Sequence, residues 1–372
     1  MSAPHVVHVF PAFSTGGPEV RTCTLINALG DEFRHTVISL NGDTTGTSRL
    51  ARPERIRQVA PDVALGPTSL LAFGRQVRHL APDLLITYGW GGTDALFAAL
   101  LQRIKPTLHI EDGFLPDEAQ GQKPARLVAR SLAFRVAHSL IVPSRTLERI
   151  ATSTWRLPAA SVRYIPNGID LARFAPATAE TRAKSRGALG IPLTSTVVGT
   201  VAMLRPDKNH ARMLRAFSTA AAGLDARIVL VGAGDCRPDL EALAQSLGCA
   251  DRVVFTGAIT DPAACYQAFD VFALSSDTEQ MPLSVLEAMA TGLPVMSTDV
   301  GDVRDMLGDE AAGVIAPLDA DDAYADIMRA LLTNPELRRS AGAGNRRRVV
   351  EQFGQDVMVG RYRDIFQEAL RG

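Results

Sequence analysis

Two glutamates bracket an apolar stretch of the sequence SSDTEQMPLSVLEAMATGLPVMSTD at residues 275–299. Glu279 precedes the run Met281–Leu286, and Glu287 follows it. Pro282 suits the first position of a helix because its missing N–H group would have no partner there, and Gly292 suits the end. The pattern therefore predicts a short helix over about 282–291, directly after the strand VFALSS. In a parallel sheet such a helix N-terminus attracts an anion such as phosphate.

Glu287 falls among apolar residues of this predicted helix, and fold stability alone does not explain it. Burying an unpaired carboxylate costs several kcal/mol, whereas the helix dipole contributes at most about 2 kcal/mol. Glu287 therefore needs a partner. It forms either a buried ion pair with an arginine such as Arg304 or hydrogen bonds with the diol of a bound sugar. The residues alone leave both interpretations open.

Short β-branched runs alternate with longer helical patterns along the whole chain, which predicts an α/β fold with parallel sheets built from β-α-β units. In the first half the predicted strands are HVVHVFPAF, HTVISL, DLLITYGW, PTLHIEDGF, HSLIVPS and VRYIPNGID, with helices near 18–30, 69–80 and 124–137. In the second half they are STVVGTVAM, ARIVLVGAG, DRVVFTGAI, VFALSS, LPVMST and AGVIAPL, with helices near 209–221, 237–247, 282–291 and 321–331.

The segment LARFAPATAETRAKSRGALGIPLTS, rich in Ala, Pro and charged residues, is the best candidate for a linker between two domains. We place the boundary near residue 178, so that the N-terminal domain spans 1–177 and the C-terminal domain spans 178–354. The last segment is an amphipathic helix with an interruption at Gly354. Its final part, about 355–372, either completes the second domain or packs back on the first.

Composition bounds the class of protein. A chain of 372 residues suits two domains of about 150–200 residues each. The N-terminus lacks the pattern of a secretion signal, and no run approaches the roughly 18 apolar residues that span a bilayer. The four cysteines form no C-x-x-C pair. We therefore expect a cytoplasmic protein without a zinc site. Residues 1–175 hold 19 Lys and Arg against 14 Asp and Glu, and residues 176–372 hold 20 against 26, an asymmetry too mild to indicate nucleic-acid binding.

The helix KPARLVARSLAFRVAHS carries Arg126 and Arg130 one turn apart beside apolar residues. As an interfacial helix it would allow a peripheral contact with the cytoplasmic membrane and suit a lipid-linked acceptor. As an ordinary surface helix it needs no special role.

The motif Glu279-x7-Glu287, followed by AMATGLPV and STDVGDVRDML, resembles the E-x7-E signature of family 4 retaining glycosyltransferases (glycosyltransferase group 1). FPAFSTGGPEVRTCTLINAL resembles their N-terminal glycine-rich donor loop, and VPSRTLERI with YIPNGIDLARF resembles the end of their first domain. LRPDKNHARMLRAF, IVLVGAGD and DRVVFTGAITD resemble parts of the second. The resemblance runs from about residue 8 to 360, and so many motifs in one order are not expected by chance, although each alone is weak.

The resemblance implies the GT-B architecture: two Rossmann-like, doubly wound parallel-sheet domains that face each other across a cleft, with the donor held mainly by the second and the acceptor by the first. It also implies a metal-independent, retaining hexosyltransferase without a cofactor, whose donor is a nucleoside-diphosphate sugar of UDP or GDP type. Glu287 would hold the ribose hydroxyls, and Glu279 would contact the donor sugar. The implied donor-binding residues are Gly16, Gly17, Arg205, Lys208, Ile259, Gln280, Met281, Pro282, Leu283 and Glu287, and the implied catalytic residues are Asp112, Arg205, Lys208 and Glu279.

The chain departs from the family pattern at two positions. The arginine that commonly stands five residues before the lysine is replaced by Met203, and Arg205 is the expected substitute because alternation puts both side chains on one face. The histidine that many relatives place before the glycine of LHIEDGF is Asp112 here. We expect Asp112 to polarise the acceptor hydroxyl or to bind a donor hydroxyl, with His109 and Glu111 as acceptor-side candidates.

The sequence thus favours a glycosyltransferase of cell-surface polysaccharide or glycolipid assembly, acting on a saccharide or a lipid-linked saccharide. Two alternatives stay open, namely another GT-B nucleotide-sugar enzyme of the 2-epimerase type and a non-catalytic sugar-nucleotide binder. For Gly16 and Gly17, an ordinary strand-to-helix turn is also open.

Overall fold

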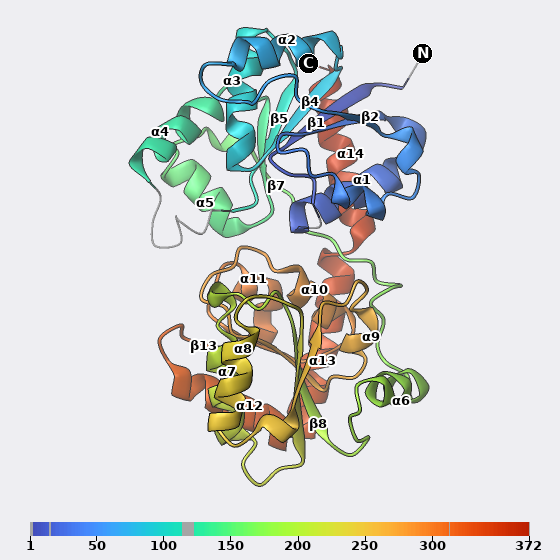
Figure 1. The fold of residues 1–372 in the computed structure, drawn as a ribbon, viewed down its shortest axis with the longest axis vertical. Helices are drawn as coiled ribbons and strands as arrows, with labels where there is room; N and C mark the ends of the chain where they lie inside the picture. Colours follow the sequence, from blue (N-terminus) through green and yellow to red (C-terminus); the bar gives the residue numbers. More distant parts are fainter. Residues whose placement is uncertain (1–2, 15, 114–122, 312, 372) are drawn as a thin grey trace. The chain divides into compact units, whose positions relative to one another are not determined.

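The computed structural model describes residues 3–14, 16–113, 123–311 and 313–371, which form two compact units (Figure 1). The first unit comprises Met1–Asn167 and Asp356–Gly372, and the second comprises Gly168–Gln355. Each is built on a parallel sheet covered by helices, which confirms the predicted α/β class. The sequence-based boundary near 178 falls inside the second unit, just before α6 (Ala179–Ala188). Within the described ranges, no helix combines the length and apolar character needed to cross a bilayer.

The sheet of the first unit has the strand order β3-β2-β1-β4-β5-β6-β7. Its strands are β1 (His5–Phe10), β2 (Arg34–Ser39), β3 (Arg57–Val59), β4 (Leu84–Tyr88), β5 (Thr107–Ile110), β6 (Ser139–Val142) and β7 (Val162–Tyr164). Numbered along the chain, this is the doubly wound Rossmann order, in which the direction of winding reverses between β1 and β4. The short edge strand β3 was not predicted, because its three residues are polar or partly exposed and show no apolar alternation.

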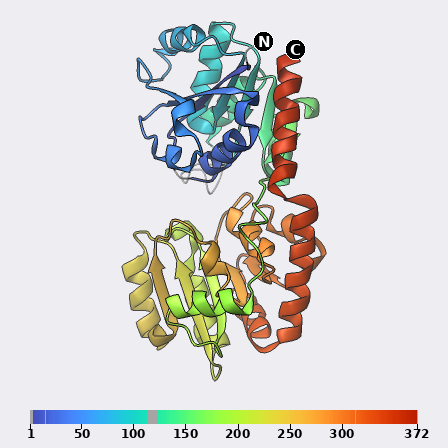
Figure 2. The same cartoon turned by 90° about the vertical axis from the view of Figure 1, so that its right-hand side faces the viewer.

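The helices of the first unit include one that is far away in sequence. They are α1 (Gly17–Leu29), α2 (Leu70–His79), α3 (Thr93–Leu101), α4 (Pro124–Ala133), α5 (Arg145–Ser153) and α14 (Gln355–Arg371). The C-terminal helix α14 places Met358, Tyr362 and Phe366 in the same core as β1 and β4. Figure 2 shows this helix running alongside the first unit. The apolar face of this helix therefore completes the first unit rather than the second.

The sheet of the second unit has the order β10-β9-β8-β11-β12-β13, again a Rossmann order, with the reversal between β8 and β11. Its strands are β8 (Thr196–Val201), β9 (Ala226–Val231), β10 (Val253–Gly257), β11 (Val271–Leu274), β12 (Val295–Thr298) and β13 (Ile315–Ala316). Its helices are α6 and, in chain order, α7 (His210–Ala220), α8 (Arg237–Ser246), α9 (Ala263–Tyr266), α10 (Leu283–Ala290), α11 (Val303–Leu307), α12 (Asp321–Thr333) and α13 (Pro335–Gln352).

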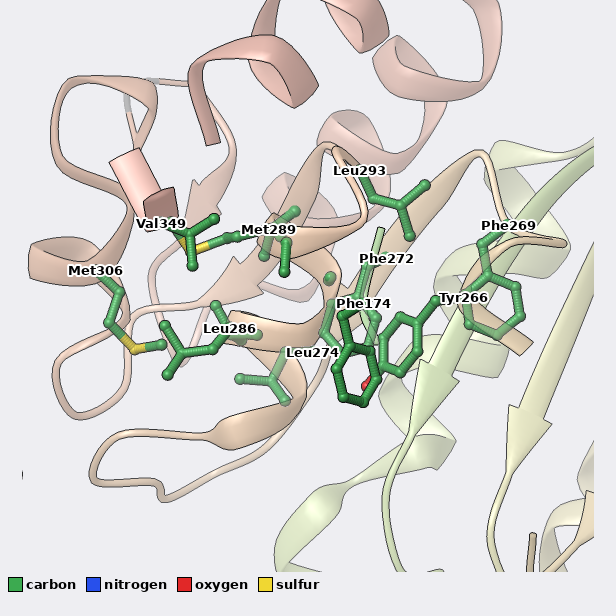
Figure 3. Close-up of a cluster of buried hydrophobic side chains, with 14 of the residues drawn as sticks. Phe174, Tyr266, Phe269, Phe272, Leu274, Leu286, Met289, Leu293, Met306 and Val349 are labelled. Carbon is green, nitrogen blue, oxygen red and sulfur yellow. The ribbon is translucent and has the colours of Figure 1, made fainter. Parts of the chain in front are cut away.

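A buried cluster on one face of this second sheet supports α10, the helix that carries Glu287 (Figure 3). Leu286 and Met289 of α10 are fully buried in the cluster, beside Tyr266 of α9 and Phe272 of β11. The aromatic ring of Tyr266 stacks on Phe272 with 5.8 Å between ring centroids. Because the apolar side of α10 is held by these contacts, the direction of its polar side is fixed as well.

Buried histidines form part of the first unit's core. His8 on β1 shares hydrogen bonds with the hydroxyl of Tyr88 at 2.8 Å and with Nδ1 of His35 at 3.0 Å. Burial lowers the pKa of His35 to about 4 and the pKa of His8 well below its ordinary value. Both imidazoles therefore stay neutral in the folded protein at pH 5, whereas the unfolded chain binds protons below a pKa of about 6.5.

We expect the first unit to lose stability as the pH falls from about 6.5 toward 4, because only the unfolded chain takes up these protons. For His35 alone, the loss between pH 7 and pH 5 is about 2 kcal/mol of unfolding free energy. Urea unfolding at both pH values measures it. The variant His35→Gln is expected to show a weaker pH dependence, whereas His79→Gln, at an exposed histidine, should match the wild type. Equal pH dependence in all three proteins would contradict this account.

Candidate functional site

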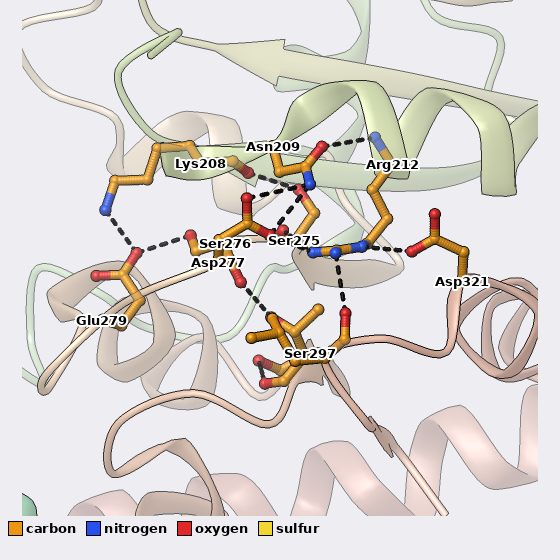
Figure 4. Close-up of polar contacts among 11 residues, drawn as sticks. Lys208, Asn209, Arg212, Ser275, Ser276, Asp277, Glu279, Ser297 and Asp321 are labelled. Atoms are coloured by element: carbon orange, nitrogen blue, oxygen red, sulfur yellow. Dashed lines mark hydrogen bonds and ion pairs between the residues drawn. The ribbon is translucent and has the colours of Figure 1, made fainter. Parts of the chain in front are cut away.

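The loops after β8 and β11 meet where the winding of the second sheet reverses, which is where open α/β sheets bind ligands. Lys208 lies in the loop after β8, and Glu279 lies in the loop after β11. The Lys208 Nζ atom is 2.7 Å from Oε1 of Glu279, and the Ser276 hydroxyl donates to the same oxygen at 2.8 Å (Figure 4). The two side chains are 16% and 14% exposed, so the ion pair is shielded but still reachable by a ligand.

A single arginine fixes the loops that carry this ion pair. Asn209, at a φ of +42°, caps the N-terminus of α7 and accepts a hydrogen bond from the backbone N–H of Arg212. The guanidinium of Arg212 donates to Asp277 at 2.8 Å and to the carbonyl oxygen of Ser275 at 3.0 Å, both in the loop after β11 (Figure 4). It also donates to Asp321, at the start of α12, at 2.7 Å. Arg212 thus ties the first turn of α7 to the loop that ends at Glu279.

A hydrogen bond from the neighbouring strand also holds this loop. The hydroxyl of Thr298, at the end of β12, donates to the carbonyl oxygen of Ser276 at 2.6 Å. Sequence reasoning missed both Arg212 and Thr298. The signal for Arg212 was available, since a cation in the first turn of a helix is unfavourable and points to a specific acid partner.

Arg205 joins the ion pair through a shared carboxylate. Its Nη2 lies 3.0 Å from Oδ2 of Asp207, and the Lys208 Nζ lies 3.4 Å from the same oxygen. Met203 and Arg205 are both exposed and flank the buried Leu204. That Arg205 takes the place of the arginine missing at Met203 stays a prediction.

Glu287 sits on α10 and has a tyrosine as partner. The Tyr266 hydroxyl donates to Oε2 of Glu287 at 2.5 Å. Burial, and then the negative charge of Glu287, raise the pKa of Tyr266 well above its ordinary value, so the phenol keeps its proton and donates. The interpretation of a buried ion pair with Arg304 is wrong, because Arg304 instead reaches the exposed Asp299 at 2.7 Å. Tyr266 was not predicted, because no local pattern links residues 21 positions apart.

The backbone between the two glutamates packs against the loop after β12. Gly301, at a φ of +52°, has so little space that an added Cβ would lie 2.5 Å from the carbonyl oxygen of Gln280 and 2.6 Å from that of Glu279. The Asp302 N–H donates to Gln280 O at 2.8 Å. This contact sets the path of the segment 280–283, which the sequence predicts to meet the donor.

The substitution Gly301→Ala is expected to displace the Glu279–Gln280 backbone, because the left-handed φ adds strain and the methyl group meets two carbonyl oxygens. Unfolding free energy should fall by about 1–3 kcal/mol, measured by urea unfolding, and nucleoside diphosphate affinity should fall with it. The control Gly248→Ala has a φ of +66° with nothing within 4 Å of the added Cβ, so it carries the strain without the clash. Equal effects of the two substitutions on affinity would refute the role of the close contact.

Gly16 and Gly17 open α1 in the first unit, and both are exposed. An ideal Cβ at Gly16 would lie 2.6 Å from Oε2 of Glu19, so the carboxylate of Glu19 occupies the space beside this glycine. Burial raises the pKa of the Glu19 carboxyl. The role of the two glycines in donor binding stays a prediction.

The residues at the end of β5 differ sharply in exposure. His109 and Glu111 are buried, with His109 Nδ1 sharing a hydrogen bond with the Thr87 hydroxyl at 2.7 Å and its ring stacked on Phe134. Asp112 is the one of the three that reaches solvent, with its side chain 21% exposed. An acceptor-side role for His109 and Glu111 stays a prediction.

The two arginines of the α4 segment, Arg126 and Arg130, lie against aromatic rings. Arg130 is fully buried and lies over the rings of Trp90 and Trp155, at 5.0 and 5.7 Å from their centroids. Arg126 is half-buried and also stacks on Trp90, at 5.3 Å. The guanidinium planes find aromatic faces inside the unit, and helical periodicity alone does not reveal such partners.

The remaining predicted donor residue, Ile259, follows β10 and is 37% exposed. Gly16, Gly17, His109, Glu111 and Asp112 belong to the first unit, and the other predicted site residues belong to the second. In the described part of the chain, no three His, Cys, Asp or Glu side chains are grouped so that they could hold a metal ion.

Comparisons with known proteins agree on the family of both halves. Residues 15–173 match the family model described as Glycosyltransferase Family 4, and residues 181–348 match the one described as Glycosyl transferases group 1. The chain is 31% identical over 254 residues to the GDP-mannose-dependent alpha-(1-6)-phosphatidylinositol monomannoside mannosyltransferase of Mycobacterium tuberculosis. This alignment covers 64% of the chain and 65% of that relative, so the chain spans just under two thirds of the relative's length.

A second relative, the D-inositol 3-phosphate glycosyltransferase of Corynebacterium urealyticum, is 29% identical over 287 residues, which cover 73% of the chain and 68% of the relative. Among solved structures, Alr3699/HepE of Anabaena in complex with UDP superposes with a TM-score of 0.85 at 20% identity, covering 98% of the chain and 100% of that structure. At this identity the superposition shows the fold alone. It confirms the predicted fold class, two Rossmann-like parallel-sheet domains of GT-B type. The chain belongs to the glycosyltransferases of family 4, group 1.

Proposed function

We propose that this protein is a retaining glycosyltransferase that moves a sugar from a nucleoside-diphosphate sugar to an acceptor hydroxyl. The observation that carries the proposal is the Lys208–Glu279 ion pair, which lies where the winding of the second sheet reverses and at the N-terminal side of α10. A cation, an acid and a helix N-terminus gathered at the carboxyl edge of a parallel sheet suit a sugar linked to a diphosphate.

The two acidic residues would hold opposite ends of the donor. Glu287, held by Tyr266, would accept hydrogen bonds from the ribose hydroxyls, and a carboxylate has enough acceptor sites to serve the tyrosine and a diol together. Glu279, oriented by Lys208 and Ser276, would accept from the donor sugar. The diphosphate would lie between them, at the backbone of Gln280, Met281, Pro282 and Leu283.

The protein would catalyse the transfer mainly by electrostatic stabilisation of the transition state. As the bond to the sugar breaks, negative charge grows on the departing nucleoside diphosphate, and fixed cations such as Lys208 and Arg205 stabilise it. In a same-face displacement the leaving phosphate helps to deprotonate the acceptor hydroxyl, so no nucleophile from the protein is needed. Asp112 of the first unit would orient a hydroxyl group of the saccharide.

The names of the relatives support an acceptor of the glycolipid or saccharide type. One is named for a phosphatidylinositol monomannoside and another for D-inositol 3-phosphate, and the Anabaena structure contains UDP. These names support our proposal of a role in cell-surface polysaccharide or glycolipid assembly.

The proposal is tested by a thermal-shift screen of nucleotide sugars, because a bound donor raises the apparent stability by about 2.7 kcal/mol at one hundred times its dissociation constant. A nucleotide sugar that raises the melting temperature should then be used as donor. With a saccharide acceptor added, nucleoside diphosphate should be released faster, and the product should be a glycoside that keeps the anomeric configuration of the donor sugar. EDTA should leave the rate intact. Binding without turnover would point to a non-catalytic binder, and release of UDP with free altered sugar and no acceptor product would point to a 2-epimerase.

The proposed location is the cytoplasm with peripheral contact at the inner membrane face through the first unit. The neighbouring helices α3 and α4 leave large apolar side chains exposed, among them Leu101 at 52%, Val128 at 58% and Leu132 at 55%. In the sequence, the exposed cations Lys123 and Arg135 flank Val128 and Leu132. Co-sedimentation with phosphatidylglycerol vesicles should exceed that with phosphatidylcholine vesicles and should fall for Val128→Glu. Equal sedimentation with both vesicles would refute the contact.

A further inference from the structure

Arg21 occupies an unfavourable position unless it has a specific task. It lies in the second turn of α1, close behind the Gly16–Gly17 turn, and its side chain is only 2% exposed. A cation near a helix N-terminus opposes the helix dipole, and burying a charge costs several kcal/mol when it is not paired. No local pattern in the sequence explains an arginine here.

The partner of Arg21 is Asp112, 91 residues away in sequence. Nη1 donates to Oδ1 at 2.5 Å and Nη2 donates to Oδ2 at 2.8 Å, so both carboxylate oxygens are held in one plane. Burial by itself would lower the pKa of Arg21, but the nearby Asp112 carboxylate, together with Tyr362 and Tyr88, raises it. The guanidinium therefore carries its charge at every pH at which the protein is folded.

Two further contacts fix the guanidinium itself. Nη1 also donates to Oδ1 of Asn167 at 3.1 Å, and the group lies 5.9 Å from the ring centroid of Tyr362 on α14. Arg21 is thus tied to the loop after β7 and to the C-terminal helix. Asp112, by contrast, keeps an exposed edge, since 21% of its side chain reaches solvent.

We propose that Arg21 is a positioning residue that holds the Asp112 carboxylate in one orientation, as a hydrogen-bond acceptor for a hydroxyl group of the bound saccharide. Each carboxylate oxygen has two acceptor sites, and Arg21 uses one on each, so that the others point outward in fixed directions. The inference rests on the proposed function and gives Asp112 the role of orienting a hydroxyl. The saccharide hydroxyl would thus be bound by the Arg21–Asp112 pair acting together, rather than by Asp112 alone.

The test compares Arg21→Lys, Asp112→Asn and the double variant with wild type, using release of UDP or GDP from UDP-glucose or GDP-mannose with a saccharide acceptor. Lysine keeps the charge but cannot hold two oxygens at once. Each single variant is expected to lower kcat/KM by about 10–100-fold, and the double variant should be no worse than Asp112→Asn, because the two residues act as one unit. The dissociation constants for UDP and GDP, by calorimetry, should stay within about twofold of wild type.

A matched control is Arg363→Lys. Arg363 also donates from two nitrogens to one carboxylate, that of Glu32. This pair lies on the exposed surface of the same unit. The substitution should leave kcat/KM unchanged. A merely structural Arg21 would lower the melting temperature without changing the rate measured well below melting, and that result would overturn the inference.

The outcomes separate the inference from the proposed function. If wild type releases no nucleoside diphosphate from either donor and binds neither UDP nor GDP, the proposed function fails and the inference falls with it. If wild type is active and Arg21→Lys or Asp112→Asn keeps the full rate, only the inference fails. Should Arg21→Lys not fold, Asp112→Asn decides, because it keeps the size of the side chain and one acceptor oxygen for Arg21.

Discussion

Replacing Lys208 by alanine is expected to lower kcat by about 10²–10³-fold, because it removes a fixed cation from the place where charge grows on the departing diphosphate. The Lys208 Nζ is held 2.7 Å from Glu279 and 3.4 Å from Asp207, so its position is set before any donor binds. The affinity for the nucleoside diphosphate should change much less than kcat, since the additional charge exists only in the transition state. Steady-state kinetics together with calorimetry of UDP or GDP binding measure the two effects.

The natural control is Lys184→Ala, which makes the same chemical change at an exposed position of α6 in the same unit and should behave as wild type. Lys208→Arg keeps the positive charge and should recover part of the lost rate. A parallel loss of kcat/KM and of nucleotide affinity by the same factor, with kcat unchanged, would show uniform binding rather than catalysis and would contradict the assignment.

Replacing Glu287 by alanine is expected to weaken nucleoside diphosphate binding itself, by about 10–100-fold. Hydrogen bonds to a charged group contribute about 1.5–3 kcal/mol, and each 1.4 kcal/mol is a factor of ten in affinity. The carboxylate is preoriented by the Tyr266 hydroxyl at 2.5 Å, and the aromatic cluster around Tyr266 holds that hydroxyl in turn. Calorimetric titration with UDP and GDP gives the loss directly.

Tyr266→Phe removes only the supporting hydroxyl and should therefore cost less affinity than Glu287→Ala. Glu241→Ala on α8 removes a half-exposed glutamate paired with Arg237 in the same unit and should leave binding unchanged. Unchanged UDP and GDP binding in Glu287→Ala would refute the assignment of Glu287 to the ribose hydroxyls.

The sequence was sufficient for the architecture, because buried parallel strands and amphipathic helices leave strong local signals. The alternation of apolar runs with helical patterns marked most of the strands, and the interruption at Gly354 separated α13 from α14. The position of Glu279 and Glu287 on either side of a helix N-terminus could also be predicted, since Pro282 is a local start signal for a helix and Gly292 a local stop signal. Weak local signals failed, as for β3, whose three residues show no period.

Only the tertiary structure decided which side chains become partners. Tyr266 pairs with Glu287, Arg21 with Asp112, and Arg212 with Asp277, and each pair is separated by between 21 and 91 residues along the chain. Such partners are chosen by the crossover connections of two parallel sheets, which bring the ends of distant strands to one edge. A local pattern records what an element is and which face is apolar. The direction in which a polar side chain points, and the partner that neutralises its charge, depend instead on residues that come close to it only in the folded protein.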